Sequence, residues 1–176
     1  DLAWTAASGE TAWNIQYGSF CFFLGQGTTV AITTNPYTLT GLNSSQTYDF
    51  YLQGVCSEVD HSQWSSATTF TTLPAKELGL TSISSYLDGC NLSNLPVSAT
   101  VTSNGFGDTV RNFTISYQIN DNAPIVENVT LAMPLTKGQT YTHTFATPAT
   151  LTADTNVIRV TINYDGDENA SNNTLS

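Results

Sequence analysis

The chain has 176 residues, of which 40% are apolar and only 10% are charged. Fourteen Asp and Glu residues outweigh four Lys and Arg residues, which gives a formal net charge of -10. An acidic surface of this kind repels phosphate backbones and anionic lipids, so we expect neither nucleic acid nor a membrane surface as a partner. No apolar run approaches the roughly 18 residues of a membrane-spanning helix.

Short stretches in the first part of the chain alternate apolar and polar residues, a period of two that predicts half-buried β-strands. They cover residues 2–6, 11–17, 27–33, 37–41, 47–56 and 67–72, and stretches rich in Gly, Asn and Ser separate them. Leu2 and Trp4 share one face, and Trp13, Ile15 and Tyr17 share the next, so the first two stretches are expected to form a hairpin. Short strands at this spacing are typical of a β-sandwich.

Pro74 interrupts this pattern, because proline has no N–H group to donate to a sheet, and we place a domain boundary there. The alternation then resumes over residues 77–86, 96–103, 111–119, 124–132, 139–147 and 156–164. No stretch of ten residues has helical periodicity. The sequence therefore predicts an all-β fold of two tandem antiparallel Ig-like β-sandwiches, residues 1–73 and 74–176.

The first part resembles a fibronectin type III domain, through Trp4, "WNIQY" and "YTLTGLNSSQTYDFYLQGVC". In that family a leucine followed by a tyrosine forms the tyrosine corner, whose hydroxyl group ties a turn to the backbone. Leu42 and Tyr48 match this pattern. The resemblance lacks the first strand of the family, so we expect the sequence to be an interior piece of a longer protein.

The second part is similar to the Ig-like, CARDB-type adhesion-related repeats of secreted and surface proteins of Bacteroidota. The similarity lies in "LTSISSYLDGCNLSNLPVSATVTSNG" and in the stretch from "FTISYQIN" to "DENASNNT". Compared with such repeats, the second part is expected to lack its final strand. The pairing of these two modules implies an extracellular or cell-surface segment whose partners are other domains of the same chain, and surface glycans or proteins.

Three cysteines are present, an odd number that implies a free thiol or a partner outside this segment in an exported chain. Cys56 shares the inward parity of Tyr48 and Phe50, which favours a small buried side chain. Cys21 and Cys56 are expected near opposite ends of the 11–17 strand, about 20 Å apart, whereas a disulfide needs Cα atoms within about 7 Å, so a Cys21–Cys56 disulfide is the less favoured alternative. Cys90 lies in a predicted loop.

The stretch "SFCFFLGQG" places Phe20, Phe22, Phe23 and Leu24 almost consecutively. If exposed, these side chains would form an apolar binding surface. Burial in the core or against the next domain is the favoured alternative.

Asp165, Asp167 and Asn169 match the D-x-D-x-N opening of a calcium loop, and Glu168 adds a carboxylate. The glycine and the distal glutamate of the full motif do not follow. Calcium is the one cofactor that the sequence suggests, and the alternative is a solvated turn whose Asp and Asn side chains cap their own backbone.

The loop "CSEVDHSQW" brings Asp60, His61 and Trp64 into one segment. Trp64 could stack on a sugar ring, with Asp60 and His61 beside it, or it could be a packing lid. No catalytic residue is predicted, because no nucleophile has a recognisable general base. "DTV" resembles the O-glycosylation motif of Bacteroidota with Thr109 as the acceptor, and N-x-S/T sequons occur at Asn43, Asn91, Asn112, Asn128, Asn169 and Asn172.

The sequence as a whole predicts a non-catalytic adhesin or spacer segment of a large bacterial surface or secreted protein. The alternative is an accessory segment, spacer or carbohydrate-binding, of a secreted polysaccharide-degrading enzyme or peptidase.

Overall fold

The computed structural model describes residues 1–7, 9–84, 92–107, 109–152 and 155–176. In that part of the chain the regular elements are eleven β-strands and one short 3-10 turn, η1 (Ala170–Asn172). All of the strand pairs are antiparallel, so the predicted all-β fold class is confirmed. The chain divides into two compact units, Asp1–Leu73 (unit 1) and Pro74–Ser176 (unit 2).

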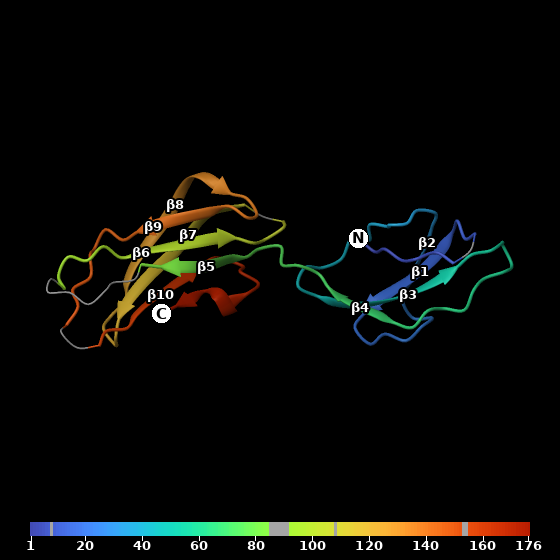
Figure 1. The fold of residues 1–176 in the computed structure, drawn as a ribbon, viewed down its shortest axis with the longest axis horizontal. Helices are drawn as coiled ribbons and strands as arrows, with labels where there is room; N and C mark the ends of the chain where they lie inside the picture. The colour runs from blue at the N-terminus through green and yellow to red at the C-terminus, as the bar shows by residue number, and fades with distance from the viewer. Residues whose placement is uncertain (8, 85–91, 108, 153–154) are drawn as a thin grey trace. The chain divides into compact units, whose positions relative to one another are not determined.

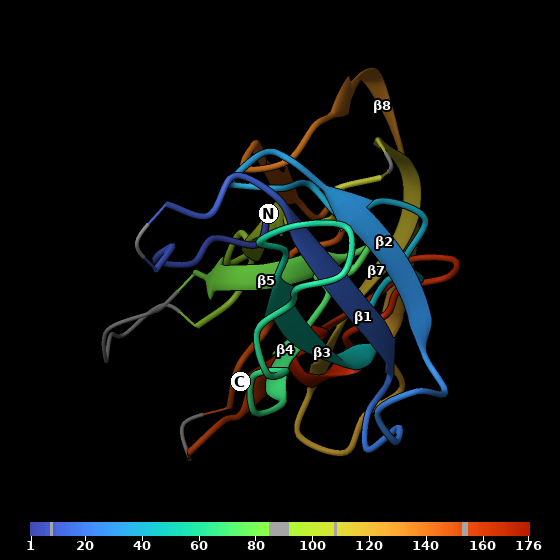
Figure 2. The same ribbon diagram turned by 90° about the vertical axis from the view of Figure 1, so that its right-hand side faces the viewer.

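Unit 1 contains a four-stranded sheet in the order β2-β1-β3-β4 (Figures 1 and 2). Its strands lie close to four of the predicted stretches: β1 (Trp13–Ser19), β2 (Thr28–Ile32), β3 (Thr47–Gly54) and β4 (Thr68–Thr71). Two alternate residues of β1 face the core, where Ile15 is fully buried and Trp13 nearly so.

The other layer of unit 1 is much smaller than predicted. Instead of strands over 2–6 and 37–41, a single bridge joins Leu2 to Tyr37 through two backbone hydrogen bonds of 2.8 and 2.9 Å. Pro36 cannot donate to a longer ladder, and the side-chain amide of Asn35 bonds to both backbone groups of Trp4 instead. The predicted hairpin of the first two stretches is also wrong, because β1 pairs with β2 and β3.

The tyrosine corner is present in unit 1. The hydroxyl group of Tyr48 accepts a hydrogen bond of 3.0 Å from the backbone N–H of Asn43, next to Leu42. This confirms the expectation that the Tyr48 hydroxyl ties the preceding turn to the backbone.

Unit 2 consists of two sheets, in the orders β11-β10-β7-β8 and β5-β6-β9. Six strands fall on the six predicted stretches: β5 (Leu78–Ile83), β6 (Ser98–Ser103), β7 (Val110–Ile119), β8 (Ile125–Leu135), β9 (Thr140–Thr144) and β10 (Ile158–Asn163). A short additional strand, β11 (Thr174–Leu175), pairs with β10.

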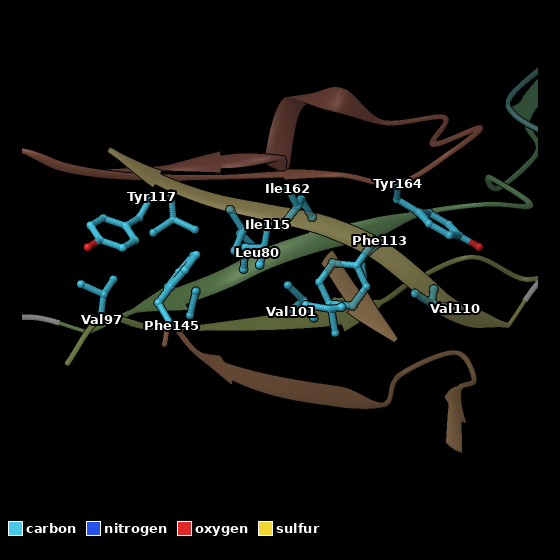
Figure 3. Packing of buried hydrophobic residues seen from close by; sticks show 14 of the residues in the cluster. Leu80, Val97, Val101, Val110, Phe113, Ile115, Tyr117, Phe145, Ile162 and Tyr164 are labelled. Atoms are coloured by element: carbon cyan, nitrogen blue, oxygen red, sulfur yellow. The ribbon is translucent and has the colours of Figure 1, made fainter. Parts of the chain in front are cut away.

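The core of unit 2 lies between its two sheets. Figure 3 shows Ile115 and Tyr117 of β7 facing Val101 and Phe145 from the opposite layer. Alternate residues of each strand point inward, as the period of two requires. The buried residues of this cluster, among those described, are Leu78, Leu80, Val97, Ala99, Val101, Val110, Phe113, Ile115, Tyr117, Val129, Leu131, Leu135, Phe145, Ala149, Val160, Ile162 and Tyr164.

Candidate functional site

The predicted recognition loop is the connection between β3 and β4 in unit 1. A bridge between Val55 and His61 closes its tip, where the Asp60 carbonyl accepts hydrogen bonds from the backbone N–H groups of Cys56 and Ser57. Two further serines extend the contact with β3, because the side-chain hydroxyls of Ser62 and Ser65 accept from Gly54 and Leu52. The loop is therefore an ordered hairpin extension whose tip projects from the sheet.

Asp60 and His61 are exposed at this tip, and Trp64 is half-buried three residues further along the same limb. The structure thus places the three predicted ligand-binding residues on one segment. His61 also borders a shallow hollow of about 290 Å³, and the other lining residues are Ala12, Trp13, Asn14, Ala31, Ile32, Thr33 and Val55. Sequence reasoning missed this hollow, because its walls come from three segments that are distant in the chain.

A general acid–base pair is not formed at this tip. Within the described ranges, no hydrogen bond joins the carboxylate of Asp60 or the imidazole of His61 to another side chain. Such catalysis needs a base within hydrogen-bond reach of the group that it deprotonates.

The aromatic loop between β1 and β2 folds back onto the outer face of the sheet in unit 1. Phe22 packs against Tyr51, with ring centroids 5.3 Å apart. Beneath the loop, the buried carboxylate of Asp49 accepts a 2.8 Å hydrogen bond from the backbone of Cys21. Phe20, Phe23 and Leu24 stay exposed, at 58%, 75% and 44%, so burial in the core is wrong for these three side chains.

The carboxylates of the predicted calcium loop contact the backbone of the segment that opens unit 2. Glu168 Oε1 accepts hydrogen bonds of 3.3 Å from the N–H groups of both Ala75 and Lys76. Asp167 accepts from Leu78 at 3.3 Å and from Asn169 at 2.9 Å. Asp165 is exposed. The predicted capping of the local backbone is thus present, and the longer contacts to residues 75–78 add to it.

The loop 104–107 holds the same segment from a different part of the chain. Its backbone N–H groups donate four hydrogen bonds, of 2.9 to 3.3 Å, to the carbonyls of Pro74, Ala75 and Glu77. Gly105 permits this approach, because a Cβ atom there would lie 2.4 Å from the Ala75 carbonyl oxygen. Residues 74–78, called the junction segment below, are therefore bonded to two loops of unit 2.

In the part of the chain that the structure describes, no three His, Cys, Asp or Glu residues gather closely enough to hold a metal ion. The D-x-D-x-N interpretation stays a prediction that depends on Asp165, Asp167 and Asn169 alone.

Cys21 and Cys56 are both exposed and free. Burial of Cys56 is therefore a wrong prediction: β3 ends at Gly54, so the inward parity of Tyr48 and Phe50 does not extend to it. Cys90, Asn91 and Asp108 of "DTV" lie outside the described residues. Thr109, the predicted acceptor, is exposed just before β7.

Two of the sequons meet on the outer face of unit 2. Asn112 pairs across the sheet with Thr130, and Asn128 pairs with Thr114, so each asparagine lies opposite the other sequon's threonine. A hollow of about 440 Å³ covers this area, and Asn163 and Asp165 also line it. Phe113 and Val129 also contribute to its lining, beside asparagine amides that can donate and accept hydrogen bonds.

Comparisons with known proteins add no family assignment to this geometry. No protein-family model matches the chain, and no curated protein matches it. Among solved structures, the chicken CNTN1 FN1-FN3 domains match with 14% identity and a TM-score of 0.32. The match covers 88% of this chain and 48% of that structure, so the chain spans about half of its length. No helix in the described ranges is both long and apolar enough to span a membrane.

Proposed function

We propose that this chain is a non-catalytic pair of β-sandwich modules in a large bacterial cell-surface or secreted protein, where it acts as a spacer or adhesin segment. The observation that carries the proposal is the junction segment. Hydrogen bonds to the 104–107 loop and to Asp167 and Glu168 fix residues 74–78 within unit 2. A first segment that hydrogen bonds hold on two sides suits a spacer, because it keeps a defined position when the chain on either side moves.

Two further features of the chain fit this proposal. The net charge of -10 with few lysines and arginines favours solubility and disfavours contact with anionic surfaces. The tyrosine corner and the sheet order β2-β1-β3-β4 support a fibronectin type III-like unit 1. A CARDB-type identity for unit 2 and an origin in Bacteroidota rest on the sequence resemblance.

The decisive experiment has two parts. The chain is incubated with polysaccharide and peptide substrates, alongside the Asp60→Asn and His61→Gln variants, and we expect no turnover in any sample. The sequence of the parent protein on either side is then read, and further β-sandwich modules are expected. Turnover that either variant abolishes, or an adjoining catalytic domain, would contradict the proposal.

The second candidate, a carbohydrate-binding accessory segment, is favoured by one observation. Trp64 is half-buried on an ordered hairpin beside the exposed Asp60 and His61. A glycan array probed with the chain and with Trp64→Ala tests it, since ring stacking on a sugar would be lost in the variant. Equal signals from both proteins would remove Trp64 from consideration.

A further inference from the structure

A buried carboxylate directly before β5 has one oxygen atom that receives no hydrogen bond. Glu77 is only 2% exposed, and its Oε1 accepts a 2.6 Å hydrogen bond from Nδ2 of Asn172, at the end of η1. Its Oε2 is buried with no donor. An unpaired, charged oxygen is costly in a protein interior, and an ion or water usually satisfies it.

Two side-chain oxygen atoms of the C-terminal turn share this condition. The side-chain Oδ1 atoms of Asn172 and Asn173 are also buried and receive no hydrogen bond. Gly79 makes room for the contact between Asn172 and Glu77, because a Cβ atom there would lie 2.2 Å from Asn172 Nδ2. The glycine thus keeps the C-terminal turn against the beginning of β5.

A second carboxylate lies beside this group. Asp167 Oδ2 accepts a hydrogen bond of 3.3 Å from the N–H of Leu78, the residue that follows Glu77. Two carboxylates and the Asn172 amide, from three segments of unit 2, therefore border the start of β5, and Asn173 follows Asn172 in the chain. The unpaired atoms are all acceptors, so what they lack is a positive charge or a donor.

The chemistry of the group selects among cations. Zinc and other softer metals prefer the nitrogen and sulfur ligands of His and Cys, which this set does not contain. Magnesium retains most of its waters and is rarely held by a cage of protein oxygens. Calcium takes carboxylate and amide oxygens together, and two carboxylates balance its charge.

We propose that Glu77, Asp167, Asn172 and Asn173 bind one Ca²⁺ ion, which joins the start of β5 to the C-terminal turn of unit 2. This set differs from the D-x-D-x-N loop read from the sequence. Asp165 and Asn169 are both exposed, whereas Glu77 is buried. Only Asp167 belongs to both sets.

The test is thermal unfolding of the whole chain in 150 mM KCl, with EGTA or with 1 mM CaCl₂. Because an ion that binds only the folded state stabilises it, we expect calcium to raise the Tm of unit 2 by about 5–10 °C. Isothermal titration calorimetry with CaCl₂ should give one site per chain. No calcium-dependent shift, or an equal shift with 1 mM MgCl₂, would overturn the proposal.

Two variants locate the site. Glu77→Gln keeps the size of the side chain and an acceptor for Asn172, yet it removes the charge, so the difference between calcium and EGTA should disappear. Asp165→Asn, the matched control in the D-x-D-x-N loop, should keep the full difference. The proposal fails if Asp165→Asn abolishes the calcium effect or if Glu77→Gln retains it, and comparing each variant with and without calcium removes any effect of the substitution on folding itself.

Discussion

The two units of this chain reach a β-sandwich by different means. Unit 2 has two sheets around a cluster of seventeen buried apolar residues in the described part of the chain. The corresponding cluster in unit 1 has four, namely Leu2, Trp13, Ile15 and Ile32, with partly buried residues packed around them. Its second layer is the Leu2–Tyr37 bridge.

Unit 1 replaces missing strand pairing with side-chain hydrogen bonds. The Asn35 amide substitutes for a strand residue opposite Trp4, and Ser62 and Ser65 bond to β3. Asp49 and Gln16 bond to the backbone of the aromatic loop. We infer that apolar burial dominates the stability of unit 2, whereas individual polar contacts carry a larger share in unit 1.

All three tryptophans, Trp4, Trp13 and Trp64, belong to unit 1. Tryptophan fluorescence therefore reports the unfolding of unit 1 alone, while far-UV circular dichroism reports both units. Urea titrations followed by both signals separate the two contributions in every experiment below.

The largest effect is expected in the core of unit 2. Phe145 is 4% exposed and packs against Tyr117 with ring centroids 4.8 Å apart. Phe145→Ala should lower the free energy of unfolding of unit 2 by about 3–5 kcal/mol, through lost burial and a cavity. The dichroism transition should shift and the fluorescence transition should not. Met133→Ala, at an 80% exposed position, serves as the control.

The second-largest loss of stability is expected from removing a buried polar contact in unit 1. Asp49 accepts hydrogen bonds from Cys21 N–H and from the Thr69 hydroxyl. Asp49→Ala leaves these donors without their acceptor, so we expect a loss of about 1–3 kcal/mol in the fluorescence transition. Asp60→Ala, an exposed acidic residue of the same unit, should change it little. If both substitutions are neutral, polar contacts do not support unit 1 as we infer.

The tyrosine corner gives a smaller effect. Tyr48→Phe removes the hydroxyl group that accepts from Asn43 and should cost about 0.5–1.5 kcal/mol in unit 1. Tyr17→Phe is the matched control, because its hydroxyl has no hydrogen bond to the described residues. A cost for Tyr17→Phe that equals the cost for Tyr48→Phe would show that the corner adds no stability.

The smallest effect is expected on the outer face of unit 2. The hydroxyl groups of Thr100 and Thr142 lie 2.9 Å apart across β6 and β9. Thr142→Val keeps the β-branched shape and removes this exposed bond, so we expect a cost of about 0.2–1 kcal/mol by dichroism. Thr140→Val provides the reference. A cost above that of Asp49→Ala would reverse the comparison between the units.

The sequence predicts most strands because their information is local. The alternation in "WNIQY" or "FTISYQI" follows from one buried face, and the structure places β1 and β7 there. The same pattern at Leu2 and Trp4 predicted a strand that shrinks to one bridge. The length of a strand depends on the segment that pairs with it. Here the pairing segment contains Pro36, which is distant from Leu2 in the sequence and cannot donate a backbone hydrogen bond.

The candidate sites show the same limit. The sequence groups Glu168 with its neighbours in the chain, but in the structure it bonds to Ala75 and Lys76, more than ninety residues away. Glu77 carries no motif at all, and only its burial with one unpaired oxygen identifies it. Local spacing can suggest a ligand set such as Asp165, Asp167 and Asn169, but it cannot reveal which oxygens fold into the interior.

The junction segment also has a mechanical consequence. Tension applied to the chain at Leu73 reaches the bonds of residues 74–78 before it reaches the ladder between β5 and β6. Those bonds end on the 104–107 loop and on the turn at Asp167 and Glu168, so the load divides between two separate parts of unit 2. A module that distributes force in this way is suited to resist being peeled open from its first strand.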